Sequence, residues 1–176
     1  MKILYIVRHA KSSWDHPGLS DHERPLLEKG KKRTKKVIDF LLEKNIQVDL
    51  IISSYAVRAF ETATIIAKAL KYPEEQIQKS TNIYHGDVDN LFNHFYDLSD
   101  NVKSLMLVGH NPTFTNFANY FMDEKIDWLA TSGIVCIEFK TDSWENILQA
   151  EKKTKFVITP KKMDLMKKRK SKSKGK

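Results

Sequence analysis

Two histidines each follow an apolar run directly, which predicts that both lie where a buried strand ends. Arg8 and His9 come after the apolar run 3–7, and His110 comes after the run 104–108. Open α/β sheets place their chemistry at the carboxyl ends of parallel strands. If these two strands are neighbours, the imidazoles meet face to face, with a guanidinium group beside them. Nucleophilic attack or proton transfer is the chemistry that such rings suit, whereas a packing role or metal ligation is the alternative for either one.

Arginine is scarce in this lysine-rich chain, so its positions are informative. Up to residue 160 it occurs only at Arg8, Arg24, Arg33 and Arg58. Arg58 lies in the first turn of a helix that we expect after a third apolar run, 49–52. A guanidinium grips a phosphate or carboxylate with two parallel hydrogen bonds, which an ammonium group cannot do. Arg58 is therefore a candidate for binding an anion, and a surface ion pair with Glu28 or Glu61 is the alternative.

The charge is divided unevenly along the chain. Residues 1–160 hold 21 basic and 21 acidic side chains, whereas residues 161–176 hold nine basic and one acidic, so the net charge of +8 comes from the end. We expect one folded domain over 1–160 and a disordered basic tail over 161–176, because the tail has little apolar surface to bury. Such a tail can bind nucleic acid, an acidic protein or an anionic membrane. A solvated tail is the simpler interpretation, so nucleic acid is an unexpected partner.

The alternation of apolar runs and amphipathic segments indicates one α/β domain. Strands are expected near 2–7, 48–52, 80–84, 104–108, 133–139, 144–149 and 154–158. Helices are expected near 29–44, 56–70, 87–97 and 112–122. This order predicts a three-layer αβα sandwich with a mostly parallel central sheet, in which the last strands run antiparallel at an edge. The interval between Arg58 and His110 is short, so we expect a compact domain without a large cap insertion.

Four blocks of sequence together resemble the histidine phosphatase superfamily. They are Arg8-His9-Ala10-Lys11-Ser12, Ser20 to Leu26 with Gly30, Ser53 to Ala63 around Arg58, and Val108-Gly109-His110-Asn111-Pro112. Any one block is a weak signal, but the ordered set over about residues 1–139 is specific. It is most similar to the small SixA-type branch, the phosphohistidine phosphatases, and the resemblance implies the same α/β fold.

The resemblance also implies a phosphatase that needs no metal or other cofactor and works through a covalent intermediate. His9 would be the nucleophile that takes the phosphoryl group onto a ring nitrogen and passes it to water, and for this it must be uncharged. Arg8, Arg58 and His110 would surround the phosphoryl oxygens and stabilise the charge of the transition state. The two guanidiniums would take the part that Mg²⁺ plays in kinases.

The loop over residues 11–26 borders the phosphate pocket in the family that the chain resembles. Ser12, Asp21 and Arg24 are therefore candidates for binding substrate or for orienting Arg8. The alternative is an ordinary turn that an internal pair between Asp21 and Arg24 closes.

Two departures from the wider superfamily bear on the substrate. Position 10 is Ala where most members have Gly, as it also is in the SixA-type branch. Many phosphomonoesterases of the superfamily carry an acidic residue before the last block to protonate an alkoxide, and no clear counterpart is visible here. Asp87, a candidate for binding substrate, or His85 could take its place. The imidazole that leaves phosphohistidine is protonated readily near neutral pH, so the lack of a clear acid favours a P–N bond as the target.

These observations predict a phosphohistidine phosphatase that acts on a protein, such as a histidine phosphotransfer domain. A phosphomonoesterase for small phosphorylated molecules is the alternative within the same enzyme class. The alternative of another class is a phosphate-binding or nucleic-acid-binding module without catalysis, and the retention of both histidines and both arginines argues against it. The apolar start is too short for a signal peptide or a membrane span, and the single cysteine, Cys136, cannot form an internal disulfide, so we expect a cytoplasmic protein.

Overall fold

The structure is a computed structural model that describes residues 1–173, except the side chains of residues 170, 172 and 173. Its strands are β1 (Lys2–Arg8), β2 (Leu50–Ser54), β3 (Gln78–Ser80), β4 (Ser104–Gly109), β5 (Ile134–Phe139) and β6 (Lys152–Ile158). Its α-helices are α1 (Glu28–Glu43), α2 (Val57–Ala69), α3 (Asn82–His85), α4 (Val88–Tyr96), α5 (Thr113–Phe121) and α6 (Pro160–Ser173). Two 3₁₀ turns matter below, η1 (Asp21–Glu23) and η3 (Trp144–Asn146).

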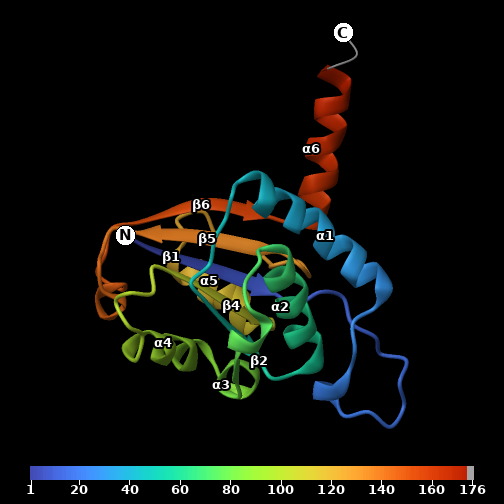
Figure 1. Ribbon diagram of the computed structural model, residues 1–176, viewed down its shortest axis with the longest axis horizontal. Coiled ribbons are helices and arrows are strands. Elements are labelled where there is room, and N and C mark those ends of the chain that lie inside the picture. The colour runs from blue at the N-terminus through green and yellow to red at the C-terminus, as the bar shows by residue number, and fades with distance from the viewer. Residues whose placement is uncertain (174–176) are drawn as a thin grey trace.

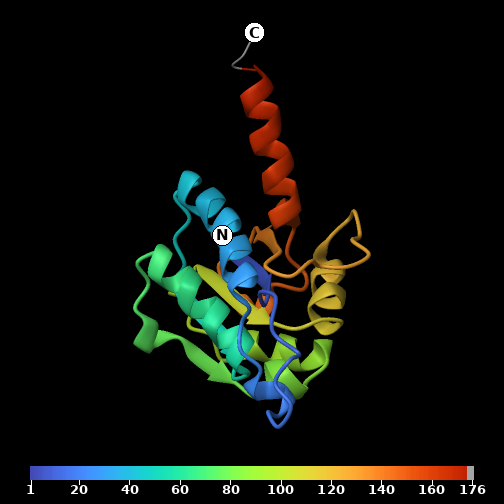
Figure 2. The same cartoon turned by 90° about the vertical axis from the view of Figure 1, so that its right-hand side faces the viewer.

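In the described part of the chain the strands form a six-stranded sheet in the order β3-β2-β4-β1-β5-β6. The strands β1 to β4 pair in parallel, whereas β5 runs antiparallel to both of its neighbours. Helices α1 and α2 cover one face of the sheet, and α4 and α5 cover the other (Figure 2). The expected three-layer αβα sandwich is therefore confirmed. Between α2 and β4 the chain adds short elements and no large cap.

The two faces of the sheet are built from alternating residues of the central strands. In β1, Leu4 and Ile6 belong to the core beneath α4 and α5, whereas Tyr5 and Val7 belong to the core beneath α1 and α2. Each of these side chains is at most 2% exposed. Side chains of a strand point alternately to opposite faces, and a strand covered on both faces needs apolar residues at every position. Burial on both faces of the sheet therefore explains the unbroken apolar runs in the sequence.

Parallel pairing of β1 with β4 places the two site histidines. The register pairs Arg8 with Gly109, so His9 and His110 leave the sheet side by side. The backbone N–H of His9 donates to the carbonyl of Gly109 at 3.0 Å. From the other side, the N–H of Ser132, just before β5, donates to the carbonyls of Arg8 at 3.1 Å and His9 at 3.2 Å. The end of β1 is thus held by both neighbouring strands.

Two of the expected strands are wrong. The segment 144–149 begins with η3 instead, and the indole of Trp144 is fully buried, with its N–H donating to the carbonyl of Val102 at 2.6 Å. This indole also stacks on the ring of Phe95 at 5.6 Å between centroids. The segment 80–84 lies mostly in α3, because β3 is shorter than expected. In both places a turn or a short helix packs its apolar residues into the core, and the sequence pattern of those residues is similar to that of a strand.

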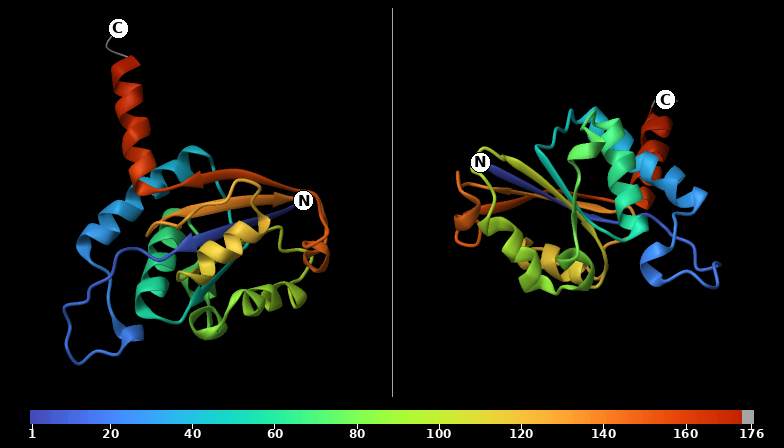
Figure 3. Two further views of the ribbon diagram at one scale, coloured as in Figure 1. Left: turned by 180° about the vertical axis from the view of Figure 1, so that it is seen from behind. Right: turned by 60° about the horizontal axis from the view of Figure 1, so that its bottom comes forward.

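Helix α6 occupies the segment for which we expected a disordered tail. It projects away from the body of the domain (Figures 1 and 3). The expectation of disorder is therefore wrong for residues 161–173, while residues 174–176 lie outside the described part. Among the described helices, none has the length and the apolar character that crossing a membrane requires.

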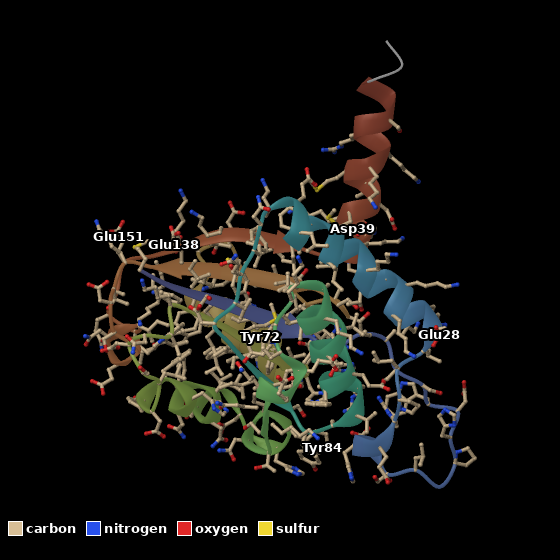
Figure 4. All side chains as sticks on the ribbon, viewed as in Figure 1. Glu28, Asp39, Tyr72, Tyr84, Glu138 and Glu151 are labelled. Carbon is tan, nitrogen blue, oxygen red and sulfur yellow. The ribbon has the colours of Figure 1, made fainter. Side chains whose placement is uncertain are left out.

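The first turns of α6 are held to α1. Met163 is 4% exposed and belongs to the core beneath α1 and α2. Asp164 pairs with Lys36 at 2.7 Å, and Lys167 pairs with Asp39 at 3.1 Å. Figure 4 shows Asp39 on α1 beside the base of α6. One buried methionine and two ion pairs therefore give the segment an attachment that its charge alone did not predict.

The N-terminal turn of α1 packs directly on the segment that follows the first histidine. The N–H of Leu27 donates to the carbonyl of Lys11 at 2.9 Å. Gly30 comes so close that a Cβ atom there would overlap the carbonyl oxygen of Lys11. Glycine is needed at this position for the close approach of two backbones. The contact fixes the distance between α1 and the loop that borders His9.

Replacing Gly30 with Ala tests this contact. Ala is the better helix former by about 1 kcal/mol, so an unobstructed site would gain stability. Because the added methyl group meets backbone, we expect the free energy of unfolding to fall instead, by about 1–3 kcal/mol, in urea denaturation. Lys32→Ala, at an exposed position of the same helix, is the control and should stay within about 0.5 kcal/mol of wild type. Stabilisation by Gly30→Ala would contradict the close approach.

Candidate active site

His9 is held as a neutral ring with one nitrogen free. Its side chain is 8% exposed, and Nδ1 lies 2.7 Å from the carbonyl oxygen of Ala10. A carbonyl can only accept, so Nδ1 carries the proton and Nε2 keeps its lone pair. Burial is the largest cause that lowers the pKa of His9; the hydrogen bond to the Ala10 carbonyl opposes it, the charges of Arg58 and Arg8 add to it, and the pKa falls to about 3. The ring is therefore uncharged at neutral pH, as a nucleophile must be.

His110 lies beside His9 at the end of β4. The two ring centroids are 5.0 Å apart and the planes are tilted by 53°, so the rings are neighbours but do not stack face to face. Nε2 of His110 lies 2.8 Å from the hydroxyl of Ser54, and Nδ1 is buried without a hydrogen-bond partner. Burial, and then the neighbouring His9 and Arg58, lower the pKa of His110 to about 2. It too is a neutral ring at neutral pH.

Arg8 is oriented by the loop that precedes β5. Its Nη1 donates to the carbonyl of Leu129 at 2.9 Å, and its guanidinium lies 5.4 Å from the ring centroid of Trp128. The side-chain amide of Asn111 donates to the same carbonyl at 2.8 Å. The residue that follows His110 therefore helps to place the guanidinium that precedes His9.

Arg58 reaches the site from the first turn of α2. It is 6% exposed and donates to the backbone carbonyl of Asp21 at 2.6 Å and to its carboxylate at 2.9 Å. The surface ion pair with Glu28 or Glu61 is not formed, since Glu61 accepts from the backbone N–H of Leu26 at 2.9 Å and Glu28 pairs with a lysine. Arg58 is thus a buried cation that is anchored on one side only.

Asp21, in η1, is the carboxylate that organises two arginines. Its Oδ2 accepts from Arg58 and, at 2.6 Å, from the hydroxyl of Tyr84, and its Oδ1 lies 3.3 Å from Nη1 of Arg24. Figure 4 shows Tyr84 on α3 at this end of the molecule. Burial alone would raise the pKa of Asp21, but the hydrogen bonds from Tyr84 and Arg58 and the charge of Arg24 lower it below its usual value. Asp21 is therefore an ionised anchor and a poor proton donor.

Arg24 is held by Ser12 and by an aromatic ring. Its Nη2 donates to the hydroxyl of Ser12 at 2.8 Å, and its guanidinium lies 3.4 Å from the ring centroid of Trp14. The Asp21–Arg24 pair that the alternative interpretation predicted is formed, at 3.3 Å. Ser12, Asp21 and Arg24 also line the cavity described below, and whether they bind substrate stays a prediction. Ser12 orients Arg24 rather than Arg8.

Thr62 has a positioning role that the sequence motif alone did not reveal. Its hydroxyl accepts from the backbone N–H of Ala10 at 2.9 Å and donates to the carbonyl of Arg58 at 2.6 Å. It is fully buried. One hydroxyl therefore ties the segment after His9 to the helix turn that carries Arg58.

The site side chains enclose a polar cavity of about 440 Å³. Its lining comprises Arg8, His9, Lys11, Ser12, Trp14, Asp21, Arg24, Arg33, Arg58, His110, Asn111 and Thr131. All four arginines that precede residue 161 thus meet in one place. Sequence reasoning missed Arg33, although the scarcity of arginine among many lysines was a signal that included it.

Within the described residues, every buried side-chain nitrogen or oxygen without a hydrogen-bond partner belongs to an arginine or histidine of this lining. These atoms are Nε of Arg8, Arg24, Arg33 and Arg58, Nη1 of Arg24 and Nδ1 of His110. A buried donor without an acceptor costs free energy, and charged donors cost most. An oxyanion such as phosphate supplies several acceptors in a geometry that guanidiniums match. The cavity is therefore chemically complementary to such an anion.

Asp87 and His85 lie outside the cavity lining. Asp87 caps α4, and its carboxylate accepts from the backbone N–H of Asn90 at 3.1 Å. The ring of His85 lies 3.2 Å from the hydroxyl of Tyr55 and 4.5 Å, between centroids, from Tyr84. The expectation that Asp87 binds substrate is not supported by its place, because an N-cap residue turns its carboxylate toward its own helix. Across residues 1–173, no three His, Cys, Asp or Glu side chains are grouped so that they could hold a metal ion.

Comparison with known proteins finds relatives over most of the chain. The family model of the histidine phosphatase superfamily (branch 1) matches residues 4–102. An uncharacterized chloroplastic protein of Arabidopsis thaliana is 29% identical over 150 residues, which cover 81% of this chain and 68% of that protein. An uncharacterized protein of Mycobacterium tuberculosis is 31% identical over 114 residues, which cover 64% of this chain and 67% of that protein.

Solved structures share the fold. The protein histidine phosphatase SixA in complex with tungstate has a TM-score of 0.77 and 18% identity, and the match covers 92% of this chain and 99% of that one. A candidate phosphohistidine phosphatase SixA from Agrobacterium tumefaciens has a TM-score of 0.76 and 24% identity, with coverage of 90% and 98%. At these identities the likeness shows the fold alone. Because the family model matches more than half of the chain, this protein belongs to branch 1 of the histidine phosphatase superfamily.

Proposed function

We propose that this chain is a phosphatase that forms a covalent phosphohistidine intermediate on His9, needs no metal ion, and acts on phosphohistidine in proteins. The observation that carries the proposal is the state of His9, a buried neutral ring whose Nε2 is free, in a cavity walled by guanidinium groups. Such a ring is a nucleophile, and the guanidiniums supply the positive charge that phosphoryl oxygens require. The similar fold of SixA bound to tungstate, an oxyanion, supports a phosphorylated substrate.

The reaction consists of two displacements at phosphorus. In the first, Nε2 of His9 attacks, the bond from phosphorus to the substrate imidazole breaks, and that imidazole leaves with the electron pair and a proton from solvent. In the second, water attacks phosphorus and gives up a proton to solvent, the electron pair of the breaking bond returns to Nε2, and phosphate and the neutral ring are released. The hydrogen bond from Nδ1 to the carbonyl of Ala10 keeps the ring oriented through both steps. Phosphoryl transfer depends mainly on such positioning and on charge stabilisation.

His110 acts as a hydrogen-bond donor although it is uncharged. When the hydroxyl of Ser54 donates to Nε2, the single proton of the neutral ring is placed on Nδ1. That nitrogen is buried and lacks a partner, and a phosphoryl oxygen provides one. The same hydroxyl accepts from the backbone N–H of Ala56 at 3.2 Å. That bond does not use the hydroxyl proton, which can therefore be donated to Nε2 of His110. Ser54 thereby selects the useful tautomer of His110.

The acid–base groups of the cavity suit a P–N bond better than a P–O bond. Among the described residues of the lining, Asp21 is the one with a carboxylate. Burial alone would raise its pKa, but hydrogen bonds from Tyr84 and Arg58 lower it. An alkoxide leaving group needs a proton donor, whereas a leaving imidazole is protonated readily near neutral pH. The ionised state of Asp21 therefore supports phosphohistidine as the substrate over a phosphomonoester.

The test of this proposal compares a phosphohistidine-bearing protein with an aryl phosphate, each with and without EDTA. We expect faster hydrolysis of phosphohistidine, no effect of the chelator, and at least a thousandfold lower turnover in His9→Ala, because the nucleophile is removed. His16→Ala is the matched control, since this histidine is exposed and lies outside the cavity lining, and it should retain turnover. Preference for the aryl ester would indicate a small-molecule phosphomonoesterase, and inactivation by EDTA would contradict metal independence.

The neutral state of His9 has a consequence for stability in acid. Between pH 6.5 and about 3 the unfolded chain binds a proton at this ring and the folded protein does not, so the free energy of unfolding falls as pH falls. When the unfolded chain binds one full proton more than the folded protein, the free energy of unfolding changes by about 1.4 kcal/mol per pH unit. We therefore expect the free energy of unfolding, measured by urea denaturation, to fall by about 2 kcal/mol less in His9→Gln than in wild type when the pH is lowered from 7 to 5. Equal losses would show that the ring is protonated in the folded protein.

A truncation separates catalysis from binding through the basic end of the chain. A chain that ends after Lys167 keeps Met163 and the ion pairs of α6 with α1, so it should fold. We expect its hydrolysis of phosphohistidine to stay within about twofold of the full chain, because surface changes remote from a site have small effects. Loss of most turnover on this truncation would move the function toward the noncatalytic, polyanion-binding alternative.

A further inference from the structure

The cavity carries more positive charge than one phosphoryl group neutralises. Among the described residues that line it, the cations are Arg8, Lys11, Arg24, Arg33 and Arg58, against the carboxylate of Asp21, and both histidines are neutral. The lining therefore has a net charge of +4, whereas a phosphoryl group carries at most about −2. About two positive charges remain unbalanced once the transferred group is bound.

Arg33 contributes to this excess from a wall that the catalytic steps do not use. Gly30 and Arg33 lie three residues apart on the same face of α1, and Gly30 abuts the backbone of Lys11. The hydroxyl of the next residue, Thr34, lies 2.8 Å from the hydroxyl of Ser132. Arg33 therefore extends over the segments that flank the end of β1. Its Nε is buried and has no acceptor.

Arg24 lines the same cavity and has donors without an acceptor. It is 8% exposed, and its plane is fixed by the ring of Trp14 at 3.4 Å and by the hydroxyl of Ser12. Its Nε has no acceptor, and Nη1 has only the longer contact with Asp21 at 3.3 Å. A guanidinium that is rigid, buried and partly unpaired is pre-organised for an oxyanion.

The size of the cavity leaves room for a second group. About 440 Å³ is within the range of pockets that hold whole small molecules, about 300–1,000 Å³, and a single phosphate fills only part of it. Charge, unpaired donors and volume therefore agree that the cavity can hold a second anionic group besides the phosphoryl group at His9.

We propose that Arg24 and Arg33 form a second oxyanion subsite, which selects substrates that carry another oxyanion close to the phosphoryl group that is transferred. The selection of substrates rests on the proposed function. The binding of two linked oxyanions does not depend on it. In a protein substrate the second group is the carboxylate of an Asp or Glu beside the phosphohistidine. In a small molecule it is a second phosphate.

Calorimetry with inorganic phosphate and pyrophosphate tests the subsite without any turnover. We expect wild type to bind pyrophosphate at least tenfold more tightly than phosphate, because two linked phosphates reach both sets of guanidiniums. Arg33→Gln should reduce this preference at least fivefold, and Arg33→Lys should leave it in between, since an ammonium group keeps the charge but loses the planar fork. Lys32→Gln removes one charge from an exposed position of the same helix and should leave the preference unchanged.

A second arm identifies the source of the oxyanion. Turnover is compared between two phosphohistidine peptides that differ only by Glu or Gln next to the phosphohistidine, and between phosphohistidine and a bisphosphate. Faster turnover of the Glu peptide, lost in Arg33→Gln, assigns a protein carboxylate, and preference for the bisphosphate assigns a small molecule. Equal affinity of wild type for phosphate and pyrophosphate, or a preference that survives Arg33→Gln, overturns the subsite. Absence of all hydrolysis with the pyrophosphate preference intact overturns only the phosphatase proposal.

Discussion

The imidazole of His9 stays uncharged because it is buried among guanidinium groups, and the rest of the site depends on this balance. Burial makes a charged ring costly, and the positive charges of Arg58 and Arg8 add to that cost. In the proposed reaction the same charges attract the phosphoryl group that the neutral ring would attack. The groups that keep the proposed nucleophile uncharged would therefore also bind its target, so no separate base would be needed to deprotonate it.

A site with this much positive charge needs a scaffold that holds it together before any ligand arrives. Parallel pairing of β1 and β4 provides the first restraint, since it sets His9 beside His110 through backbone hydrogen bonds alone. Asp21 provides the second, because one carboxylate accepts from Arg58 and lies against Arg24. Both arginines are thereby held in place by a carboxylate that itself lines the cavity, and their Nε atoms remain without a hydrogen-bond partner.

The sequence predicted what local pattern controls and missed what tertiary packing decides. Unbroken apolar runs ending in a histidine identified the central strands and the strand exits. The strand expected at 144–149 was wrong because burial of Trp144 in a turn produces the same apolar signal. The segment after Pro160 was assigned as disordered from its charge, although the burial of Met163 depends on a surface of α1 that no local pattern reveals. The sequence could not show that Asp87 caps α4 outside the cavity lining, because a capping carboxylate and an acid for catalysis look alike in sequence.

The contrast between arginine and lysine links the sequence to the chemistry most directly. Lysines of this chain stand mostly at the surface, where a strongly hydrated ammonium group keeps its water. Guanidiniums are more weakly hydrated and stay charged when buried, so they can be packed against Trp14, Tyr84 and Trp128 without losing their charge. That property explains why the four arginines before residue 161 converge on one cavity from β1, the following loop, α1 and α2. Lysines at those positions would lose hydration that a ring cannot replace, and the cavity would not hold its charge in the absence of a ligand.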